Sequence, residues 1–345
     1  MIRESLPLLD ERLRIFEVAA ASISAEPTVA ERSFSEDARR GLTATPKVLL
    51  PKYFYDALGS RLFEAICELP EYYVTRAEAE IFQRHADEIA GALDGPLRLL
   101  ELGSGDGRKT RLLIAALVAR QGGLEYLPID VSRSAVEQGA ERLLHAFPEL
   151  TVTAFVADYH AALLSVRGER VPPGVRTLAL FLGSTIGNLD AEDRVGLLRE
   201  IRAVLRPGDG LLLGTDLRKS ESVLLPAYDD ALGVTAAFNL NLLSRINREL
   251  GGAFDLGTFR HRARWNRELG RIEMHLESLR EQTVPIRGLG LEVRFAAGET
   301  IHTESSYKFE PAQVAEMAEA GGFALRRTWT DRGGRFASNL LTAVG

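Results

Sequence analysis

The chain has a single cysteine, Cys67, among its 345 residues. One thiol excludes an intrachain disulfide and a zinc site built from several thiolates. A lone cysteine with apolar neighbours is more often a small core residue than a nucleophile. Long hydrophobic runs are also lacking, because the longest purely apolar segment, Leu112–Ala119, is much too short to span a bilayer. We therefore expect neither a membrane-spanning helix nor a membrane partner.

The sequence has no excess of positive charge. It carries 48 acidic and 42 basic residues, a formal net charge of −6. Because a nucleic acid requires a basic face on its partner, this balance argues against one. The N-terminus holds acidic residues that do not suit a secretory or transit signal: Glu4, Asp10, Glu11 and Glu17. We expect a cytoplasmic monomer.

Signatures of metal and nucleophile chemistry are missing too. The six histidines stand at positions 85, 145, 160, 261, 275 and 302, and no two have the helical spacing of a metal pair. His302 and Glu304 are two residues apart, but no third ligand joins them in sequence. There is no Ser-His-Asp order and no G-x-S-x-G elbow. We predict no metal ion.

The most informative segment that is present is Leu99–Thr110, with glycines at 103, 105 and 107 between an apolar strand and a helical run. Such a junction lets a nucleotide-like ligand lie against bare backbone. Asp130 ends the next apolar strand, 25 residues after Gly105, where a carboxylate accepts hydrogen bonds from ribose hydroxyls. The pattern resembles the first motif of S-adenosylmethionine (SAM)-dependent methyltransferases. An ordinary tight turn is the alternative.

Short apolar runs alternate with helical segments after a predicted helix over residues 77–93. Buried parallel strands produce such runs, and the alternation predicts a doubly wound α/β sheet. The segments Phe323–Thr330 and Phe336–Val344 are predicted to form an antiparallel hairpin. A parallel sheet that ends in such a hairpin is the class I, Rossmann-like methyltransferase arrangement, whereas a dehydrogenase sheet continues parallel. The predicted parallel strands are 97–102, 124–130, 151–158, 177–183 and 209–215.

The alternation stops between Lys219 and Lys308. A helix is predicted over 226–249, followed by strands over 259–265, 271–280, 290–296 and 300–308. Insertions of this kind commonly shape the substrate pocket. The segment 41–76 is aromatic-rich and, with three prolines, is expected to be irregular. The common spacing of Leu8, Leu9, Leu13 and Phe16 predicts a helical N-terminal extension (1–40). We further predict a smaller α+β substrate-binding domain (41–76 plus 219–308) and a SAM-binding methyltransferase domain (77–218 plus 309–345).

Further candidate residues follow from position. Asn188 lies in a small-residue loop after the fourth predicted strand, where its amide both donates and accepts. Tyr159 and its neighbour Asp158 follow the third strand and are candidates for bordering an adenine. Alternation places Glu304 and Ser306 on one face of a strand, where they can hold a polar heterocycle together. A turn asparagine, a strand-end turn and a solvated edge strand are the respective alternatives.

Several segments together resemble the L-histidine Nα-methyltransferases of ergothioneine biosynthesis, in the same order along the chain. These enzymes methylate one α-amine three times to give hercynine, the betaine of histidine. Most of the segments lie outside the generic cofactor fold, which makes the resemblance specific. They are Gly41–Lys47, Pro51–Ser60, Leu69–Arg76, Phe181–Asn188, Leu212–Asp216, Ala227–Asp230 and Thr303–Phe309.

The resemblance implies a role for each matching position. Those of the SAM site are Gly103, Lys109, Asp130, Asp158 and Tyr159. On the substrate side, Asn188 and Tyr228 match a neutral clamp for the carboxylate. Glu304 and Ser306 match the pair that holds the imidazole, and Met274 matches a wall of the pocket. An indole has no use for a carboxylate at position 304, so this pair favours histidine over a tryptophan derivative.

The remaining matches are aromatic. Tyr72 matches a further histidine contact, and Tyr55 and Phe63 match residues beside the amine. An ammonium has no lone pair, so each round of methylation must start with loss of a proton. We expect Tyr55 to accept or relay it. Two alternatives stay open at this point: a methyltransferase of another α-amino acid, and a non-catalytic SAM-binding module.

Overall fold

The computed structural model describes residues 2–4, 10–18, 33–105, 107–167 and 171–345. The chain divides into two compact units, which are described separately below. The first unit comprises Met1–Ala25, Arg76–Leu217 and Phe309–Gly345, and the second comprises Glu26–Thr75 and Arg218–Lys308.

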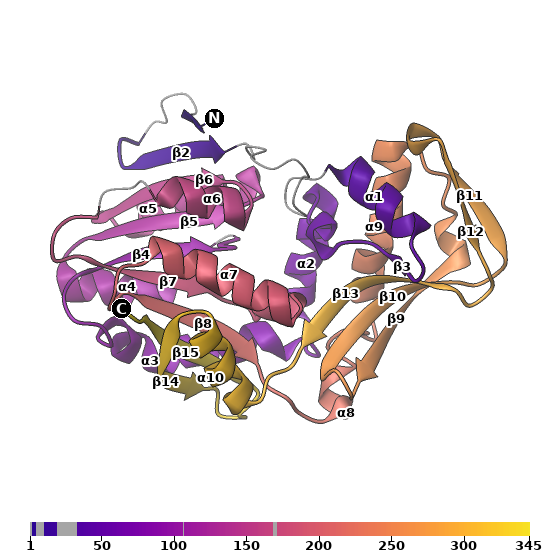
Figure 1. Cartoon of the computed structure of the whole chain (residues 1–345). Coiled ribbons are helices and arrows are strands. Elements are labelled where there is room, and N and C mark those ends of the chain that lie inside the picture. Colours follow the sequence, from indigo (N-terminus) through magenta and orange to yellow (C-terminus); the bar gives the residue numbers. More distant parts are fainter. Residues whose placement is uncertain (1, 5–9, 19–32, 106, 168–170) are drawn as a thin grey trace. The chain divides into compact units, whose positions relative to one another are not determined.

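A nine-stranded sheet forms the centre of the first unit (Figure 1). In spatial order its strands are β1 (Ile2–Glu4), β2 (Leu13–Val18), β6 (Leu150–Val156), β5 (Leu124–Asp130), β4 (Leu97–Leu102), β7 (Arg176–Phe181), β8 (Gly210–Asp216), β15 (Phe336–Ala343) and β14 (Phe323–Thr330). The six strands from β2 to β8 in this order are parallel, and β15 and β14 close the sheet antiparallel. The predicted fold class, a doubly wound sheet that ends in an antiparallel hairpin, is confirmed.

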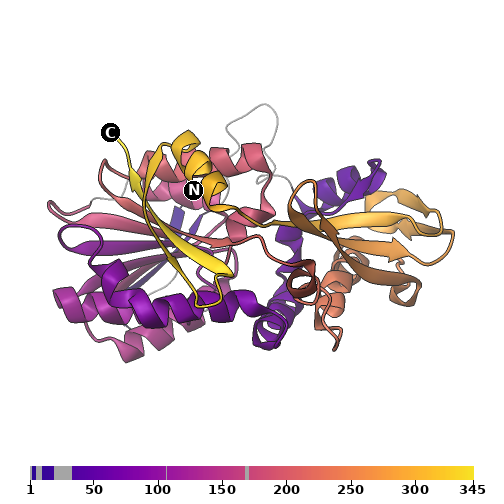
Figure 2. The same cartoon turned by 90° about the horizontal axis from the view of Figure 1, so that it is seen from below.

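Helices cover both faces of this sheet. They are α3 (Tyr73–Ala90), α4 (Arg111–Gln121), α5 (Arg133–Ala146), α6 (Tyr159–Val166), α7 (Ala191–Val204) and α10 (Pro311–Ala320), with the 3-10 turn η2 (Thr185–Asn188). Figure 2 shows α3 and α4 on one face, and α7 and α10 on the other. The strand order reverses between β4 and β7, and ligands bind at the carboxyl ends of strands around such a switch point.

The structure corrects the prediction for the N-terminal forty residues. Segment 13–18 is strand β2, which runs parallel to β6, and not part of a helix. Leu13 and Ile15 are buried and alternate with exposed or half-buried residues, and this period of two prevails over the helical spacing of Leu13 and Phe16. Leu8 and Leu9, which also supported the predicted helix, lie outside the described residues.

The second unit is an α+β fold around a four-stranded sheet in the order β3 (Lys47–Val48), β13 (Thr300–Tyr307), β10 (Arg271–Ser278) and β9 (Phe259–Asn266). Strands β13, β10 and β9 are antiparallel neighbours, and β3 pairs parallel with β13. A separate hairpin joins β11 (Gln282–Ile286) and β12 (Leu291–Phe295). The other elements are α1 (Phe34–Thr43), η1 (Pro51–Phe54), α2 (Ala57–Glu68), α8 (Glu221–Leu224), α9 (Val234–Leu250), η3 (Leu256–Thr258) and η4 (Arg287–Leu289).

Two sequence predictions for this unit are wrong in detail. The segment expected to be irregular contains helix α2, because its three prolines stand outside the helix and Asp56 caps its N-terminus. The long helix expected from residue 226 begins at Val234, since the carboxylate of Asp230 accepts hydrogen bonds from the N–H groups of Val234 and Thr235 and holds a turn there.

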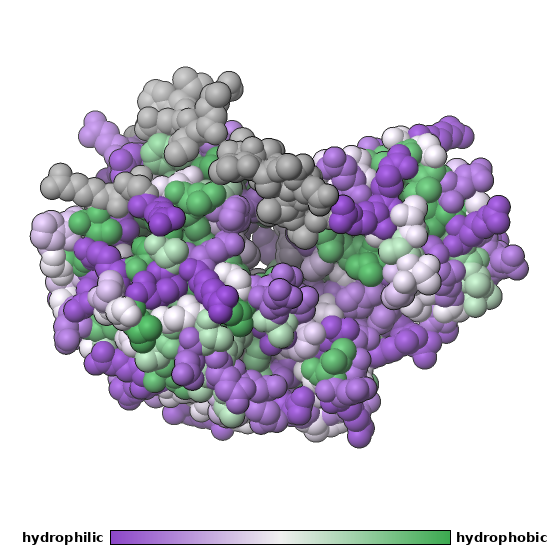
Figure 3. Space-filling view, viewed as in Figure 1, coloured by the Kyte–Doolittle hydropathy of each residue, from purple (hydrophilic) through white to green (hydrophobic). Residues whose placement is uncertain are grey.

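The surface that Figure 3 shows is mostly hydrophilic, with apolar residues in small groups. Large exposed apolar side chains lie far apart in the sequence, Leu232 and Val131 being the most exposed. In the part of the chain that the structure describes, every helix is too short or too polar to cross a membrane.

Candidate functional site

The glycine loop after β4 folds back against the end of β5. The N–H of Gly103 donates to the carbonyl of Ile129 at 2.8 Å. Gly103, Gly105 and Gly107 have φ angles of 72°, 51° and 70°, in the left-handed region that favours glycine. A Cβ on Gly103 would lie 2.8 Å from the hydroxyl oxygen of Tyr159. The loop therefore presents bare backbone beside this tyrosine, as a nucleoside ligand requires.

Asp130, at the end of β5, ties the loop to the strand. Its carboxylate accepts hydrogen bonds from the N–H of Gly105 and from the N–H of Ser132, both at 2.9 Å. Burial raises the pKa of Asp130, and these backbone hydrogen bonds oppose that effect. A carboxylate has about four lone-pair positions, so Asp130 keeps capacity for the two hydroxyls of a ribose.

Lys109 precedes helix α4 and points to a buried acid. Its Nζ lies 2.6 Å from Oε2 of Glu78, a fully buried residue of α3. The carboxylate of Glu78 also accepts from the N–H of Gly183, at 2.8 and 3.1 Å. Gly183 belongs to the loop after β7, so Glu78 joins that loop to the lysine beside the glycine loop. Sequence analysis missed Glu78, because an acid in a polar helix is usually solvated.

The remaining candidates of the first unit also lie beyond the carboxyl ends of the parallel strands. Asp158 caps α6, where its carboxylate accepts from the N–H of Ala161 at 2.9 Å. The ring of Tyr159 meets Phe181 edge-on, with centroids 5.5 Å apart, and burial raises the pKa of its hydroxyl. Asn188 ends the turn η2 and is half-buried. One edge of the sheet thus gathers all the predicted SAM-binding residues and Asn188.

In the second unit, five aromatic side chains form a continuous group. Tyr55 meets Phe63 edge-on at 5.5 Å between centroids, and Phe63 meets Tyr72 at 6.2 Å. The ring centroid of Phe238 of α9 lies 5.8 Å from that of Tyr55 and 6.0 Å from that of Phe63. Tyr72 in turn meets Tyr228 edge-on, with ring centroids 6.3 Å apart. Sequence analysis did not single out Phe238, because an apolar residue in a helix carries no mark of the face it packs on.

The group ends in a set of buried polar side chains. The hydroxyls of Tyr228 and Ser306 are 2.8 Å apart, and Nζ of Lys308 donates to both at 2.7 Å. Glu304 lies two residues before Ser306 on β13 and is 8 % exposed. Met274 of β10 is the register partner of Glu304 and is buried too. The second unit therefore brings together every predicted substrate-binding residue except Asn188.

Glu304 is the acid of this set, and its pKa is strongly shifted. Burial raises its pKa to about 7, although the positive charge of Lys308 opposes the rise. Burial and the neighbouring tyrosine Tyr228 likewise raise the pKa of Tyr72 well above its ordinary value. A carboxyl group that changes charge near neutral pH is suited to bind a group that titrates in the same range, such as an imidazole.

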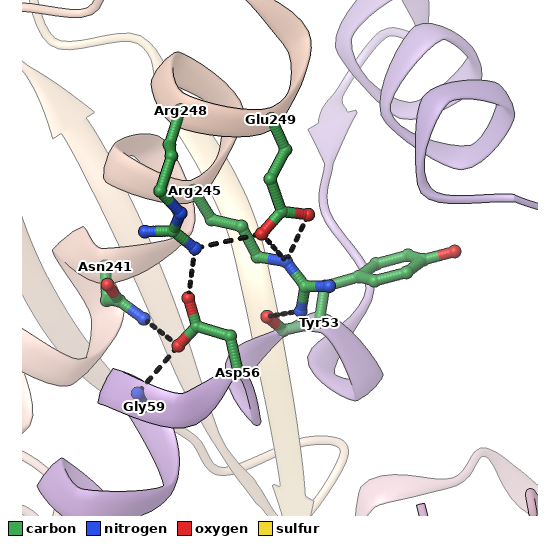
Figure 4. Close-up of polar contacts among 7 residues, drawn as sticks. All are labelled: Tyr53, Asp56, Gly59, Asn241, Arg245, Arg248 and Glu249. Carbon is green, nitrogen blue, oxygen red and sulfur yellow. Dashed lines mark hydrogen bonds and ion pairs between the residues drawn. The ribbon is translucent and has the colours of Figure 1, made fainter.

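Polar contacts join Tyr53 and Asp56, which flank Tyr55 in the chain, to α9 (Figure 4). The next residue, Asp56, accepts from the N–H of Gly59 at 2.7 Å and from the amide of Asn241 at 2.8 Å. Its other carboxylate oxygen accepts a hydrogen bond from the guanidinium of Arg248 at 2.5 Å. Arg245 donates to the carbonyl of Tyr53 at 2.9 Å. These contacts hold both sides of Tyr55, so its backbone is well positioned.

The described residues contain no group of three or more histidine, cysteine, aspartate and glutamate side chains placed to hold a metal ion. The structure thus presents two constellations, the glycine-loop edge in the first unit and the aromatic and polar group in the second.

Comparison with known proteins decides the family. A family model described as histidine-specific, SAM-dependent methyltransferases matches residues 34–343. The chain belongs to this family. It is 46% identical over 314 residues to a histidine N-alpha-methyltransferase of Mycolicibacterium smegmatis, with 90% of this chain and 95% of that protein covered. It is 45% identical over 304 residues to the protein of the same name from Mycobacterium tuberculosis, covering 88% and 93%.

A more distant relative is a longer protein, of which the match covers only a part. The ergothioneine biosynthesis protein 1 of Schizosaccharomyces pombe is 29% identical over 277 residues, and the match covers 79% of this chain but 36% of that protein. Within this family of methyltransferases, the two constellations of the present chain have a direct interpretation. The glycine-loop edge suits SAM, and the polar group of the second unit suits an amino acid with a polar side chain.

Proposed function

We propose that this methyltransferase transfers three methyl groups from SAM to the α-amino group of L-histidine, giving hercynine in the first step of ergothioneine biosynthesis. The family match and the names of the relatives support this proposal. The observation that carries it is the buried carboxyl of Glu304, with a pKa of about 7, on the same strand face as the Ser306 hydroxyl. A substrate with a hydrocarbon side chain would offer a hydrogen-bond partner to neither group.

SAM supplies the methyl group. We assign its ribose to Asp130, which holds the glycine loop and keeps lone pairs for hydroxyls. Lys109 is suited to the cofactor carboxylate, and its contact with the buried Glu78 fixes the direction of the ammonium. The ring of Tyr159, at the bare backbone of Gly103, is suited to border the adenine.

We assign the imidazole of histidine to Glu304 and Ser306, with Met274 as an apolar wall beside it. The carboxylate group of Glu304 accepts an imidazole N–H, and the Ser306 hydroxyl donates or accepts at the second ring nitrogen. The α-carboxylate is assigned to the hydroxyl of Tyr228 and the amide of Asn188. Both are neutral donors, which bind an anion without an arginine.

The aromatic side chains Tyr55, Phe63 and Tyr72 are suited to the amine. The faces of such rings attract a methylated ammonium, with each contact worth roughly 0.5–2 kcal/mol. We assign to the Tyr55 hydroxyl the acceptance or relay of the proton that the ammonium loses before each transfer. Orientation of the nitrogen provides most of the rate, because intramolecular positioning reaches effective molarities of about 10⁵ M or more.

Binding of histidine to the Glu304→Ala variant tests the substrate assignment. We expect the dissociation constant for histidine to rise at least tenfold, since the imidazole loses its charged partner, while SAM binding stays unchanged. Glu299→Ala is the matched control, because Glu299 pairs with Lys47 just before β13 and has no assigned contact with substrate. Unchanged histidine affinity in Glu304→Ala would refute the assignment. A monomeric state, the absence of a metal ion and a cytoplasmic location remain predictions.

A further inference from the structure

Lys308, immediately after β13, is among the largest fully buried side chains in the described part of the chain. Its ammonium donates to the hydroxyl of Tyr228 and to the hydroxyl of Ser306, both at 2.7 Å. These hydroxyls are 2.8 Å apart, so the three polar atoms form a closed triangle. The ammonium also lies 4.6 Å from the centroid of the Tyr228 ring. Sequence analysis assigned no role to this lysine.

An ammonium fixes the direction of the hydrogen bonds around it. It has three hydrogens to donate and no lone pair, so both hydroxyl oxygens accept from Lys308. The hydrogens of Tyr228 and Ser306 therefore point to other acceptors, one of which is the neighbouring hydroxyl. A hydroxyl that accepts from a cation is also a stronger donor, because hydrogen bonds in a chain polarise one another. The pair is thus prepared to donate to an anion.

Glu304 is a charged group close enough to this ammonium to respond to its charge. Lys308 lowers the pKa of Glu304, but burial outweighs it and the pKa stays near 7. Glu304 is therefore only partly ionised at neutral pH. Two roles for Lys308 follow, and they differ in the part of the substrate that they affect. Through Glu304 and Ser306 it would act on the imidazole, and through the Tyr228 hydroxyl it would act on the α-carboxylate.

We propose that Lys308 is a positioning residue that makes the Tyr228 hydroxyl a donor to the α-carboxylate and so selects amino acids over the corresponding amines. The proposal rests on the proposed function, since it takes histidine as the substrate. The geometry supports this role, because the ammonium of Lys308 donates to the Tyr228 hydroxyl at 2.7 Å and lies 4.6 Å from the centroid of the same ring.

The test compares two ligands on the full-length chain. Histamine has the imidazole and the amine of histidine but lacks the carboxylate. We expect Lys308→Met, which keeps an unbranched apolar side chain without the ammonium, to weaken histidine binding at least tenfold and histamine binding less than threefold in calorimetric titrations. Lys219→Met is the matched control, since Lys219 donates to Tyr73 at 2.8 Å in the same unit, and it should change neither affinity.

Equal weakening of both ligands would overturn the proposal, because it would place the effect at the imidazole or on the fold. Unchanged affinities for both would overturn it as well. A double variant adds a second criterion: in a Tyr228→Phe background, Lys308→Met should weaken histidine binding less than threefold. A full tenfold loss there would show that Lys308 does not act through Tyr228. If circular dichroism shows that Lys308→Met is unfolded, Lys308→Gln takes its place.

The unsubstituted protein separates this proposal from the one on which it rests. If it binds SAM but no histidine, the proposed function fails. If it binds histidine normally and only the comparison of histidine with histamine goes against expectation, the role of Lys308 alone fails.

Discussion

Glu304, which we assign to substrate binding, lowers the stability of the folded protein when its buried carboxyl ionises. Its carboxyl is 8 % exposed, and burial raises its pKa to about 7. A folded-state pKa above the ordinary value of 4.5 means that ionisation opposes folding. The stability that this group contributes is complete below pH 4.5 and is lost as the pH rises through 7.

Replacing Glu304 by glutamine should therefore stabilise the ligand-free protein at high pH. Glutamine does not titrate, so the melting temperature of Glu304→Gln relative to the unsubstituted protein should rise between pH 5 and pH 8, by the equivalent of at most about 3 kcal/mol. Glu101, whose pKa is also raised to about 7 by burial, is common to both proteins and cancels. Thermal unfolding at the two pH values measures the effect. A difference in melting temperature that does not change with pH would contradict it.

The proposed proton acceptor can be tested by removing one oxygen atom. Tyr55→Phe keeps the ring that contacts Phe63 and Phe238 but removes the hydroxyl. We expect kcat to fall at least tenfold while the dissociation constant for histidine changes less than threefold. Rapid-quench kinetics and calorimetry measure the two quantities. Turnover equal to that of the unsubstituted protein would discard this role for Tyr55.

At the scale of the elements, the backbone of the glycine loop is constrained by the tyrosine beside it. Gly103→Ala puts a Cβ at a φ of 72° and 2.8 Å from the Tyr159 hydroxyl. Gly122→Ala is a matched control, because Gly122 has a φ of 74° and a Cβ added there would meet no atom within 4 Å, which leaves only the backbone cost. That cost, about 1 kcal/mol, is shared by both variants.

We expect SAM affinity to fall at least tenfold in Gly103→Ala and to stay within threefold in Gly122→Ala, because only the first displaces a residue assigned to the adenine. Calorimetric titration with SAM measures both. Equal affinities in the two variants would show that the close approach of Tyr159 has no part in cofactor binding.

Helix α2 depends on a cap that also contacts another helix. Asp56→Ala removes the N-cap of α2 together with the hydrogen bonds from Asn241 and Arg248 of α9. We expect it to lower the free energy of unfolding by roughly 2–3 kcal/mol. Asp190→Ala removes only the cap of α7, which accepts from two backbone N–H groups, and should cost about 1 kcal/mol. Urea titration compares them, and equal losses would mean that the contacts with α9 contribute nothing.

At the scale of the whole molecule, the sequence predicts the first unit well. Strands β4 and β5 match their predicted bounds, because strands buried on both faces are continuous apolar runs. Residues 13–18 and 57–68 were assigned to the wrong structure, since in each a weak local pattern competes with a tertiary partner, β6 in the first case and α9 in the second.

For the candidate site too, the sequence predicts one part better than the other. Most residues of the proposed SAM edge are predictable from spacing, because the carboxyl ends of neighbouring parallel strands meet at one edge, whereas Lys109 needed the family resemblance. The substrate group needed the family resemblance, as no spacing links Tyr55 to Glu304. Lys308 and Phe238 were missed by both routes. Their roles depend on burial against residues distant in sequence, and no local pattern records that.

Mass spectrometry of the purified protein, incubated with SAM and each of the twenty amino acids in turn, tests the central claim most directly. The account predicts that histidine alone gains mass, up to three methyl groups, all on the α-nitrogen. Methylation of a different amino acid, or no methylation by a protein that still binds SAM, would contradict it.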